Sequence, residues 1–332
     1  MKQGIELAVD DSASLRVAGR RLAVIVADDR GTDETAEAEG VRLLAVNRAA
    51  GLIGGMDTER ALHLARVGQP YHTPLLLPGE AAGALPGDAV FTLGVRPAWR
   101  GKVLAQYASS ELKAKKALVL IDDRDPIALE LAAAFLQAWP RDDGRSVRQE
   151  TVHTDAEFQD QTSQAVAAKP DLLLIASAAP AFLKANAALE AGGLHVPILY
   201  GGEDVGVEAL ATRQGDVYTA TVFTPDELTE RGQTFAKQYQ DRFHEAPDLA
   251  AVQGYDAARL LFDAMARAKS AAADKVREQL TTTTDFESLT GPLRFKDGRA
   301  HRRVFVLSLH DGAVKVTWKI DAGADDSPDA AR

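Results

Sequence analysis

The stretch ALVLIDDRDPIALELAAAFLQAWP, residues 117–140, carries the two patterns that decide the fold. It opens with five consecutive apolar residues that end in two aspartates, as a strand buried on both faces of a parallel sheet does. Apolar residues then recur every fourth position from Ile127 to Trp139, the spacing of a helix with one buried face, until Pro140 ends it. This stretch therefore predicts a strand followed by a covering helix.

Short apolar runs of the same kind recur along the chain, each bounded by turn residues. They stand at residues 22–27 (LAVIVA), 51–54 (GLIG), 74–77 (PLLL), 171–176 (DLLLIA) and 196–200 (VPILY). Strands that alternate with helices are typical of α/β folds with parallel sheets. Because 332 residues exceed one ordinary core, we predict two doubly wound, Rossmann-like lobes.

The C-terminal third changes character. Residues 227–269 show a helical pattern, residues 292–295 (PLRF) an apolar strand, and residues 304–318 a hairpin with an Asp311-Gly312 turn. Residues 321–332 are predicted to form a flexible tail.

Composition and motifs exclude several classes of function. The net charge of −10 without a recurrent basic stripe argues against a nucleic-acid partner. The chain has no cysteine, and its seven histidines show no metal-ligand spacing, so we expect no metal site. The dinucleotide fingerprint G-x-G-x-x-G, the P-loop and G-x-S-x-G are all absent, so we expect no enzymatic activity and no cofactor, and an NAD(P)-type enzyme is disfavoured.

The order of the segments resembles the leucine/isoleucine/valine-binding protein family, the type I periplasmic binding proteins of ABC transporters. The resemblance rests on a series of motifs: residues 3–11 (QGIELAVDD), 53–55 (IGG), 117–123 (ALVLIDD), 170–177 (PDLLLIAS), 196–204 (VPILYGGED), the expected helix start at 255–257 (YDA) and 283–295 (TTDFESLTGPLRF). It implies an extracytoplasmic solute-binding protein, periplasmic or extracellular, that captures an amino acid, amide or carboxylate between its lobes and delivers it to a membrane permease.

The resemblance also implies how the chain is divided. Lobe one is expected at residues 1–113 plus 224–302 and lobe two at 114–223 plus 303–320, joined by a three-crossing hinge near residues 113–116, 223–225 and 302–305. The family begins with a strand and a glycine-rich loop, whereas Met1 falls directly on the first helix. We therefore expect the first strand of lobe one to be absent from this sequence and the natural start to lie upstream.

In lobe one, the resemblance assigns ligand contacts to two loops. Thr58 occupies the position of the family's carboxylate-binding hydroxyl, next to Asp57, although either residue also suits a plain helix N-cap. Glu80 and Ala81 replace a small residue and a hydroxyl that contact the ligand in the family. A carboxylate there argues for a ligand other than an ordinary amino acid, or for an outward-facing side chain.

In lobe two, Glu203 matches the family's acid that pairs with the ligand's ammonium group, and its alternative is a solvated acidic loop. Ile127 and Ala178 stand where the family has aromatic residues, so we expect a wider or less selective cavity. Trp99, in the expected turn at residues 96–100, is a further candidate contact or a packing residue.

Two other functions stay open at this stage. The same fold serves as the ligand-sensing domain of receptors and regulators, and a scaffold that has lost its ligand is the third alternative.

Overall fold

A computed structural model describes residues 1–55, 58–203, 216–310 and 312–321. The chain divides into two compact units: unit 1 comprises Met1–Arg96 and Pro225–Arg303, and unit 2 comprises Pro97–Thr224 and the strands from Val304 onward. The first boundary differs from the one expected at residue 113, because the helix that starts at Pro97 belongs to unit 2. The expected tail lies outside the described residues from 322 onward.

Unit 1 is built on a six-stranded sheet of order β11-β12-β13-β5-β4-β3. Strands β3, β4, β5 and β13 run parallel, and β11 and β12 complete the sheet with antiparallel pairing. The bounds are β3 (Leu52–Ile53), β4 (Leu75–Leu77), β5 (Val90–Thr92), β11 (Phe286–Ser288), β12 (Gly291–Lys296) and β13 (Arg299–Arg302). A separate small ribbon pairs β1 (Arg16–Val17) with β2 (Arg20–Arg21).

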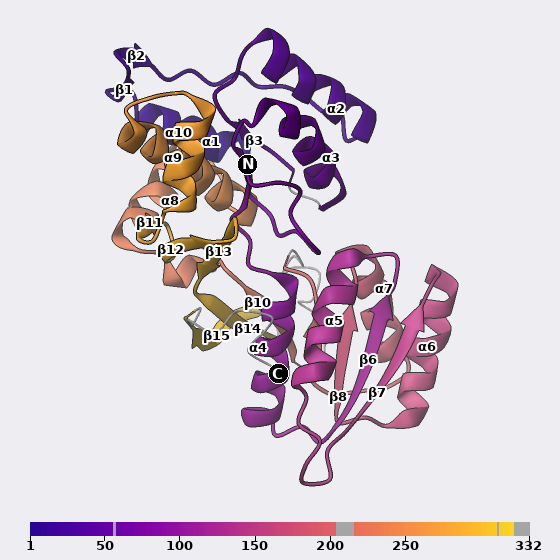
Figure 1. Ribbon diagram of the computed structural model, residues 1–332. Coiled ribbons are helices and arrows are strands. Elements are labelled where there is room, and N and C mark those ends of the chain that lie inside the picture. Colours follow the sequence, from indigo (N-terminus) through magenta and orange to yellow (C-terminus); the bar gives the residue numbers. More distant parts are fainter. Residues whose placement is uncertain (56–57, 204–215, 311, 322–332) are drawn as a thin grey trace. The chain divides into compact units, whose positions relative to one another are not determined.

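Helices cover both faces of this sheet. Alternation along β4 directs Leu76 toward the apolar cluster of α9 and α10, whereas Leu75 and Leu77 join the cluster of η1 and α3. Figure 1 shows α2 and α3 on one side of β3 and α9 and α10 on the other. The helical segments are α1 (Lys2–Asp11), α2 (Asp33–Val41), the π-helical η1 (Arg42–Val46), α3 (Thr58–Gly68), η2 (Gln69–Tyr71), η4 (Pro225–Glu227), α8 (Glu230–Phe243), α9 (Leu249–Ala268) and α10 (Ala273–Thr281).

Unit 2 contains a seven-stranded sheet of order β15-β14-β10-β9-β8-β6-β7. The five strands from β10 to β7 are parallel, and the hairpin of β14 and β15 adds antiparallel to β10. The bounds are β6 (Lys116–Asp122), β7 (Ser146–Val152), β8 (Leu172–Ala176), β9 (Ile198–Tyr200), β10 (Val217–Thr221), β14 (Val304–His310) and β15 (Ala313–Ile320).

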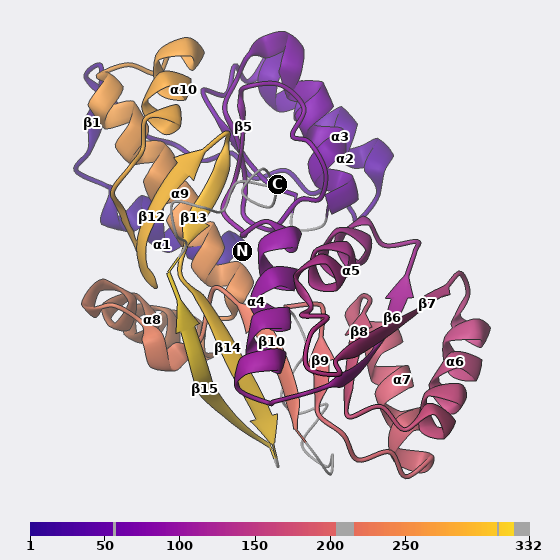
Figure 2. The same cartoon turned by 60° about the horizontal axis from the view of Figure 1, so that its bottom comes forward.

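Four helices accompany this sheet: α4 (Pro97–Ser110), α5 (Pro126–Ala138), α6 (Asp155–Ala168) and α7 (Ala179–Ala191). Ala165 of α6 and Phe182 of α7 belong to one apolar cluster with strand residues such as Leu173. Figure 2 shows α5 on the opposite side of β6 and β8 from α7. Both units are thus doubly wound α/β layers, and the predicted fold class is confirmed.

Most predicted elements are confirmed. The runs near residues 51–54, 74–77, 117–121, 171–176 and 196–200 form β3, β4, β6, β8 and β9, and residues 292–295 lie in β12. The predicted C-terminal hairpin is β14 with β15, although Asp311 of its turn lies outside the described residues. The expected helix start at residues 255–257 is wrong, because α9 begins at Leu249 and Asp248 caps it by accepting from the Ala251 amide at 2.7 Å.

The run LAVIVA at residues 22–27 is also an incorrect prediction. It enters none of the strand ladders among the described residues, and Val24, Ile25 and Val26 are 43%, 48% and 57% exposed. A β-branched apolar run becomes a buried strand only when a neighbouring strand supplies backbone partners. Here β3 ends the described sheet on one side, and residues 22–27 do not pair with it.

Candidate functional site

The predicted site residues of unit 1 follow two neighbouring parallel strands. The Gly54–Gly55 loop comes after β3, and the segment with Glu80 and Ala81 comes after β4. Because β3 and β4 are paired and parallel, both loops leave the same edge of the sheet. Open α/β sheets bind ligands beyond this edge.

The first loop packs tightly against α3. Gly55 has a φ of +76°, and a Cβ there would lie 2.6 Å from the Cα of Ala61, so the position requires glycine. Thr58 is the first residue of α3. Asp57 and the side chain of Thr58 lie outside the described part of the chain, so both stay predictions as ligand contacts.

The second loop is held in place by its neighbours. Glu80 and Ala81 are both buried, with 9% and 0% of their surface exposed. Gly94 approaches so closely that a Cβ there would lie 2.5 Å from the Glu80 amide nitrogen. Arg299 donates to the carbonyl oxygens of Ala81, at 2.8 Å, and of Gly83. Glu80 is therefore a buried carboxylate on a fixed loop, and its role as a ligand contact stays a prediction.

In unit 2, three predicted residues follow neighbouring strands. Ile127 lies in the first turn of α5 after β6, Ala178 is the exposed N-cap residue of α7 after β8, and Glu203 follows β9. Strands β6, β8 and β9 are adjacent and parallel, so all three residues stand at one edge of the sheet. The structure thus brings together these three predicted contacts.

The side chain of Glu203 is shielded from solvent, and its role as a ligand contact stays a prediction. Its side chain is 8% exposed, and its Oε1 lies 3.9 Å from Nε of Arg100, which is 0% exposed. The preceding glycine pair is required by packing, since a Cβ on Gly202 would lie 2.1 Å from the Tyr200 hydroxyl. The Thr219 hydroxyl donates to the Gly202 carbonyl at 2.6 Å, which fixes the loop that carries Glu203.

Arg100 is the residue that the sequence reasoning missed. It projects from the first turn of α4, where Pro97 begins a helix instead of the expected turn. Its guanidinium donates through Nε to the Ala220 carbonyl at 2.9 Å and through one Nη to the Gly201 carbonyl at 2.6 Å. Burial raises the pKa of Asp125 above its ordinary value, and the charge of Arg100 opposes part of this shift. No periodic pattern marks an arginine as buried, because the residue type is usually exposed.

Trp99 precedes Arg100 in the same helical turn and is half-buried. Its Nε1 is shielded from solvent and has no hydrogen-bond partner among the described residues. A buried donor of this kind favours a ligand or water acceptor, and its role as a contact stays a prediction.

A second buried ion pair in unit 1 explains the motif at residues 283–295. Asp256 of α9 accepts from the Leu289 amide at 3.0 Å and lies 3.6 Å from Arg302. Arg302 in turn donates to the hydroxyls of Ser288 at 3.0 Å and Thr290 at 2.7 Å. Burial raises the pKa of Asp256 to about 6, against the opposing charge of Arg302. This network ties α9 to the β11–β12 turn and is structural.

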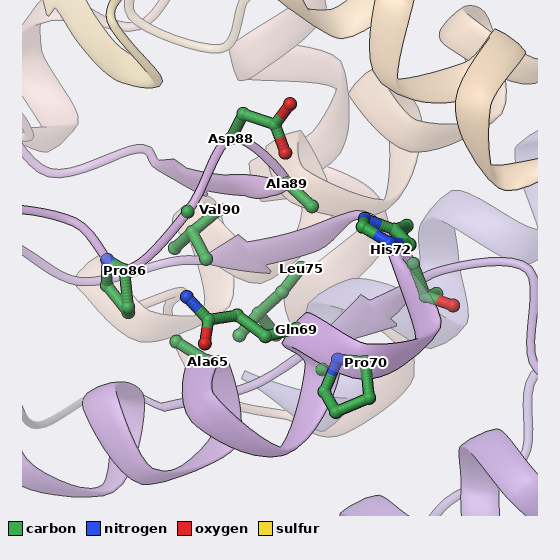
Figure 3. Close-up of a pocket in the computed structure, with 12 residues that line it drawn as sticks. Ala65, Gln69, Pro70, His72, Leu75, Pro86, Asp88, Ala89 and Val90 are labelled. Atoms are coloured by element: carbon green, nitrogen blue, oxygen red, sulfur yellow. The ribbon is translucent and has the colours of Figure 1, made fainter.

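One cavity in unit 1, of about 400 Å³, lies at the opposite end of the strands. Figure 3 shows its lining, which includes Ala65 of α3, Gln69, His72, Leu75 at the start of β4 and Val90 at the start of β5. None of the predicted contacts lines it. The described residues contain no cluster of side chains suited to a metal ion. Within the same residues, no helix has the length and apolar character needed to cross a bilayer.

Comparisons with known proteins agree with this architecture. The leucine-binding protein LivK of Thermotoga maritima MSB8 is 21% identical and superposes with a TM-score of 0.85 over 96% of this chain and 93% of its own. The branched-chain amino-acid-binding protein LivJ of Streptococcus pneumoniae, solved with isoleucine, is 22% identical. It superposes with a TM-score of 0.81 over 96% of this chain and 93% of its own.

A solute-binding protein of an ABC transporter from R. palustris, solved with benzoate, is 22% identical, with a TM-score of 0.81 over 98% of this chain and 92% of its own. No curated protein matches the sequence. The family model of periplasmic binding proteins matches residues 1–313. The chain therefore belongs to the periplasmic binding protein family.

Proposed function

We propose that this chain is the extracytoplasmic solute-binding component of an ABC-type importer, which captures a small polar ligand and hands it to a membrane permease without chemical change. The observation that carries the proposal is the placement of Glu203, Ala178 and Ile127 at one edge of the parallel strands of unit 2. Relatives of the same fold were solved with amino acids and with benzoate, which supports a small amino acid, amide or carboxylate as the ligand.

We further propose that each unit, taken by itself, carries a candidate ligand-contacting loop. Glu80 and Ala81 supply a fixed, buried surface in unit 1, and Glu203 and Trp99 do so in unit 2. Fixed polar groups on an otherwise apolar surface are the usual means by which a binding site orients a small molecule.

A thermal-shift screen against amino acids, small amides, aliphatic carboxylates and aromatic acids tests this function. A ligand that binds only the native state raises the melting temperature by mass action, so we expect a selective shift with one chemical class. Glu203→Ala should strongly reduce the shift, whereas Asp160→Ala, which removes an exposed acid on α6, should retain it. A shift that is equal in both variants would contradict the assigned site.

A further inference from the structure

The carboxylate of Glu203 lies beside an opposite charge, the guanidinium of Arg100 on α4. Arg100 is fully buried, Glu203 is 8% exposed, and 3.9 Å separates Nε from Oε1. Charges this close, away from water, interact far more strongly than a surface pair does. Each therefore offsets much of the cost of burying the other.

Arg100 is fixed in this position. Its two donated hydrogen bonds, to the carbonyls of Gly201 and Ala220, join the ends of β9 and β10. The next residue, Gly101, packs directly on α5, where a Cβ would lie 2.2 Å from the Leu131 carbonyl oxygen. The helix backbone that carries Arg100 is therefore held against α5, and the two hydrogen bonds hold the guanidinium itself.

This arrangement changes what Glu203 offers to a ligand. A buried carboxylate without a cation nearby demands an ammonium group, because a ligand that lacks one leaves the charge unpaired. With Arg100 beside it, Glu203 is compensated before any ligand binds, and an incoming ammonium group meets a cation as well as an anion. Selectivity for the amino group is lost.

We propose that Arg100 is a positioning residue that neutralises Glu203 and makes the site accept small carboxylic acids that lack an α-amino group as well as the corresponding amino acids. The inference rests on the proposed function and names the substrate class of the same site. Arg100 acts through Glu203 and is not itself required to touch the ligand.

Calorimetric titration at pH 7 with matched pairs of ligands tests this loss of selectivity for the amino group. Leucine is compared with 4-methylpentanoate, and phenylalanine with 3-phenylpropanoate, so that each pair differs only in the amino group. For the pair whose carbon skeleton fits, we expect dissociation constants within about tenfold of each other. A site built around an ammonium group would discriminate by about 10⁴-fold, as sites designed to hydrogen-bond a polar group do.

Variants separate charge compensation from a merely structural role. Arg100→Gln should shift the ratio of the two dissociation constants toward the amino acid by tenfold or more, whereas Arg100→Lys, which keeps the cation, should leave it near the wild-type value. If Arg100 had only a structural role, Arg100→Gln would weaken the binding of both ligands of a pair equally and leave the ratio of their dissociation constants unchanged. If Arg100→Gln does not fold, the wild-type ratio of the two dissociation constants still decides.

Two results would overturn the inference while leaving the proposed function intact: a wild-type preference for the amino acid above 100-fold, or a ratio unaffected by Arg100→Gln. Failure of the folded wild-type protein to bind any member of the thermal-shift panel would overturn both the proposed function and this inference.

Discussion

At the scale of single residues, the buried charges are the feature of this structure that the sequence pattern does not predict. Arg100 with Glu203 in unit 2, and Arg302 with Asp256 in unit 1, place four ionisable side chains out of water. Such groups need partners brought from distant parts of the chain, and sequence spacing does not reveal those partners. Glu203 could be predicted as a site residue because it ends a strand motif, whereas Arg100 could not, since its partners come from β9 and β10.

Asp256 makes stability depend on pH in a direction that can be checked. Burial raises its folded-state pKa to about 6 from an ordinary value of 3.8, so between these two values the folded protein binds more protons than the unfolded chain. The contribution of this group to the free energy of unfolding should therefore fall by about 3 kcal/mol as pH rises from about 4 to 6, and stay constant above.

Urea denaturation of the wild type and of Asp256→Asn across this pH range measures the effect. The amide keeps an oxygen for the Leu289 amide but does not titrate, so the difference in unfolding free energy between the two proteins should change within this window. Asp241→Asn, an exposed change on α8, serves as the control. A pH-independent difference between wild type and Asp256→Asn would contradict the raised pKa.

At the scale of elements, α4 is determined both by a local preference, proline at its first position, and by a tertiary contact, its packing against α5. Pro97 at its first position could have indicated the start of a helix from the sequence, yet only the fold assigns this helix to unit 2. It lies against α5 with Gly101 at the point of closest approach. A pattern of apolar residues does not specify which neighbouring helix a glycine must accommodate.

Gly101→Ala should destabilise unit 2 by about 2 kcal/mol, because the added methyl group would overlap the Leu131 carbonyl oxygen and force the helices apart. Gly68→Ala is the matched control, since it ends α3 with a backbone φ of −72° and its nearest atom would be 4.0 Å away. That control should be neutral or stabilising by up to about 1 kcal/mol. Chemical denaturation compares the two, and equal effects would contradict the close helix packing.

The run at residues 22–27 supplies an element-scale prediction of its own. Because it enters no described strand ladder and exposes Val24 to Val26, its amide protons should exchange with solvent far faster than those of Leu75–Leu77 in β4. Hydrogen exchange followed by mass spectrometry of peptides from both segments measures this contrast. Protection of residues 22–27 equal to that of β4 would show that a further strand pairs with them.

At the scale of the whole molecule, the sequence is sufficient to predict the α/β architecture of each unit. It is not sufficient to predict every strand pairing or where every helix begins. Alternating strand and helix patterns predicted β4, β6, β8 and α5 because both faces of a parallel strand are buried by the chain's own helices. Residues 22–27 and the start of α9 were mispredicted, because pairing partners and a capping aspartate decided them. The ligand is not encoded in any of these patterns, since fold alone does not fix function.

Calorimetric titration of the folded protein with the best ligand from the thermal-shift screen tests the central claim most directly. We predict saturable binding of one ligand per chain, weakened at least tenfold by Glu203→Ala, with a stabilisation of about 2.7 kcal/mol at a ligand concentration 100 times the dissociation constant. Absence of saturable heat with every amino acid, amide and carboxylate tested, from protein that unfolds cooperatively, would contradict the solute-binding account.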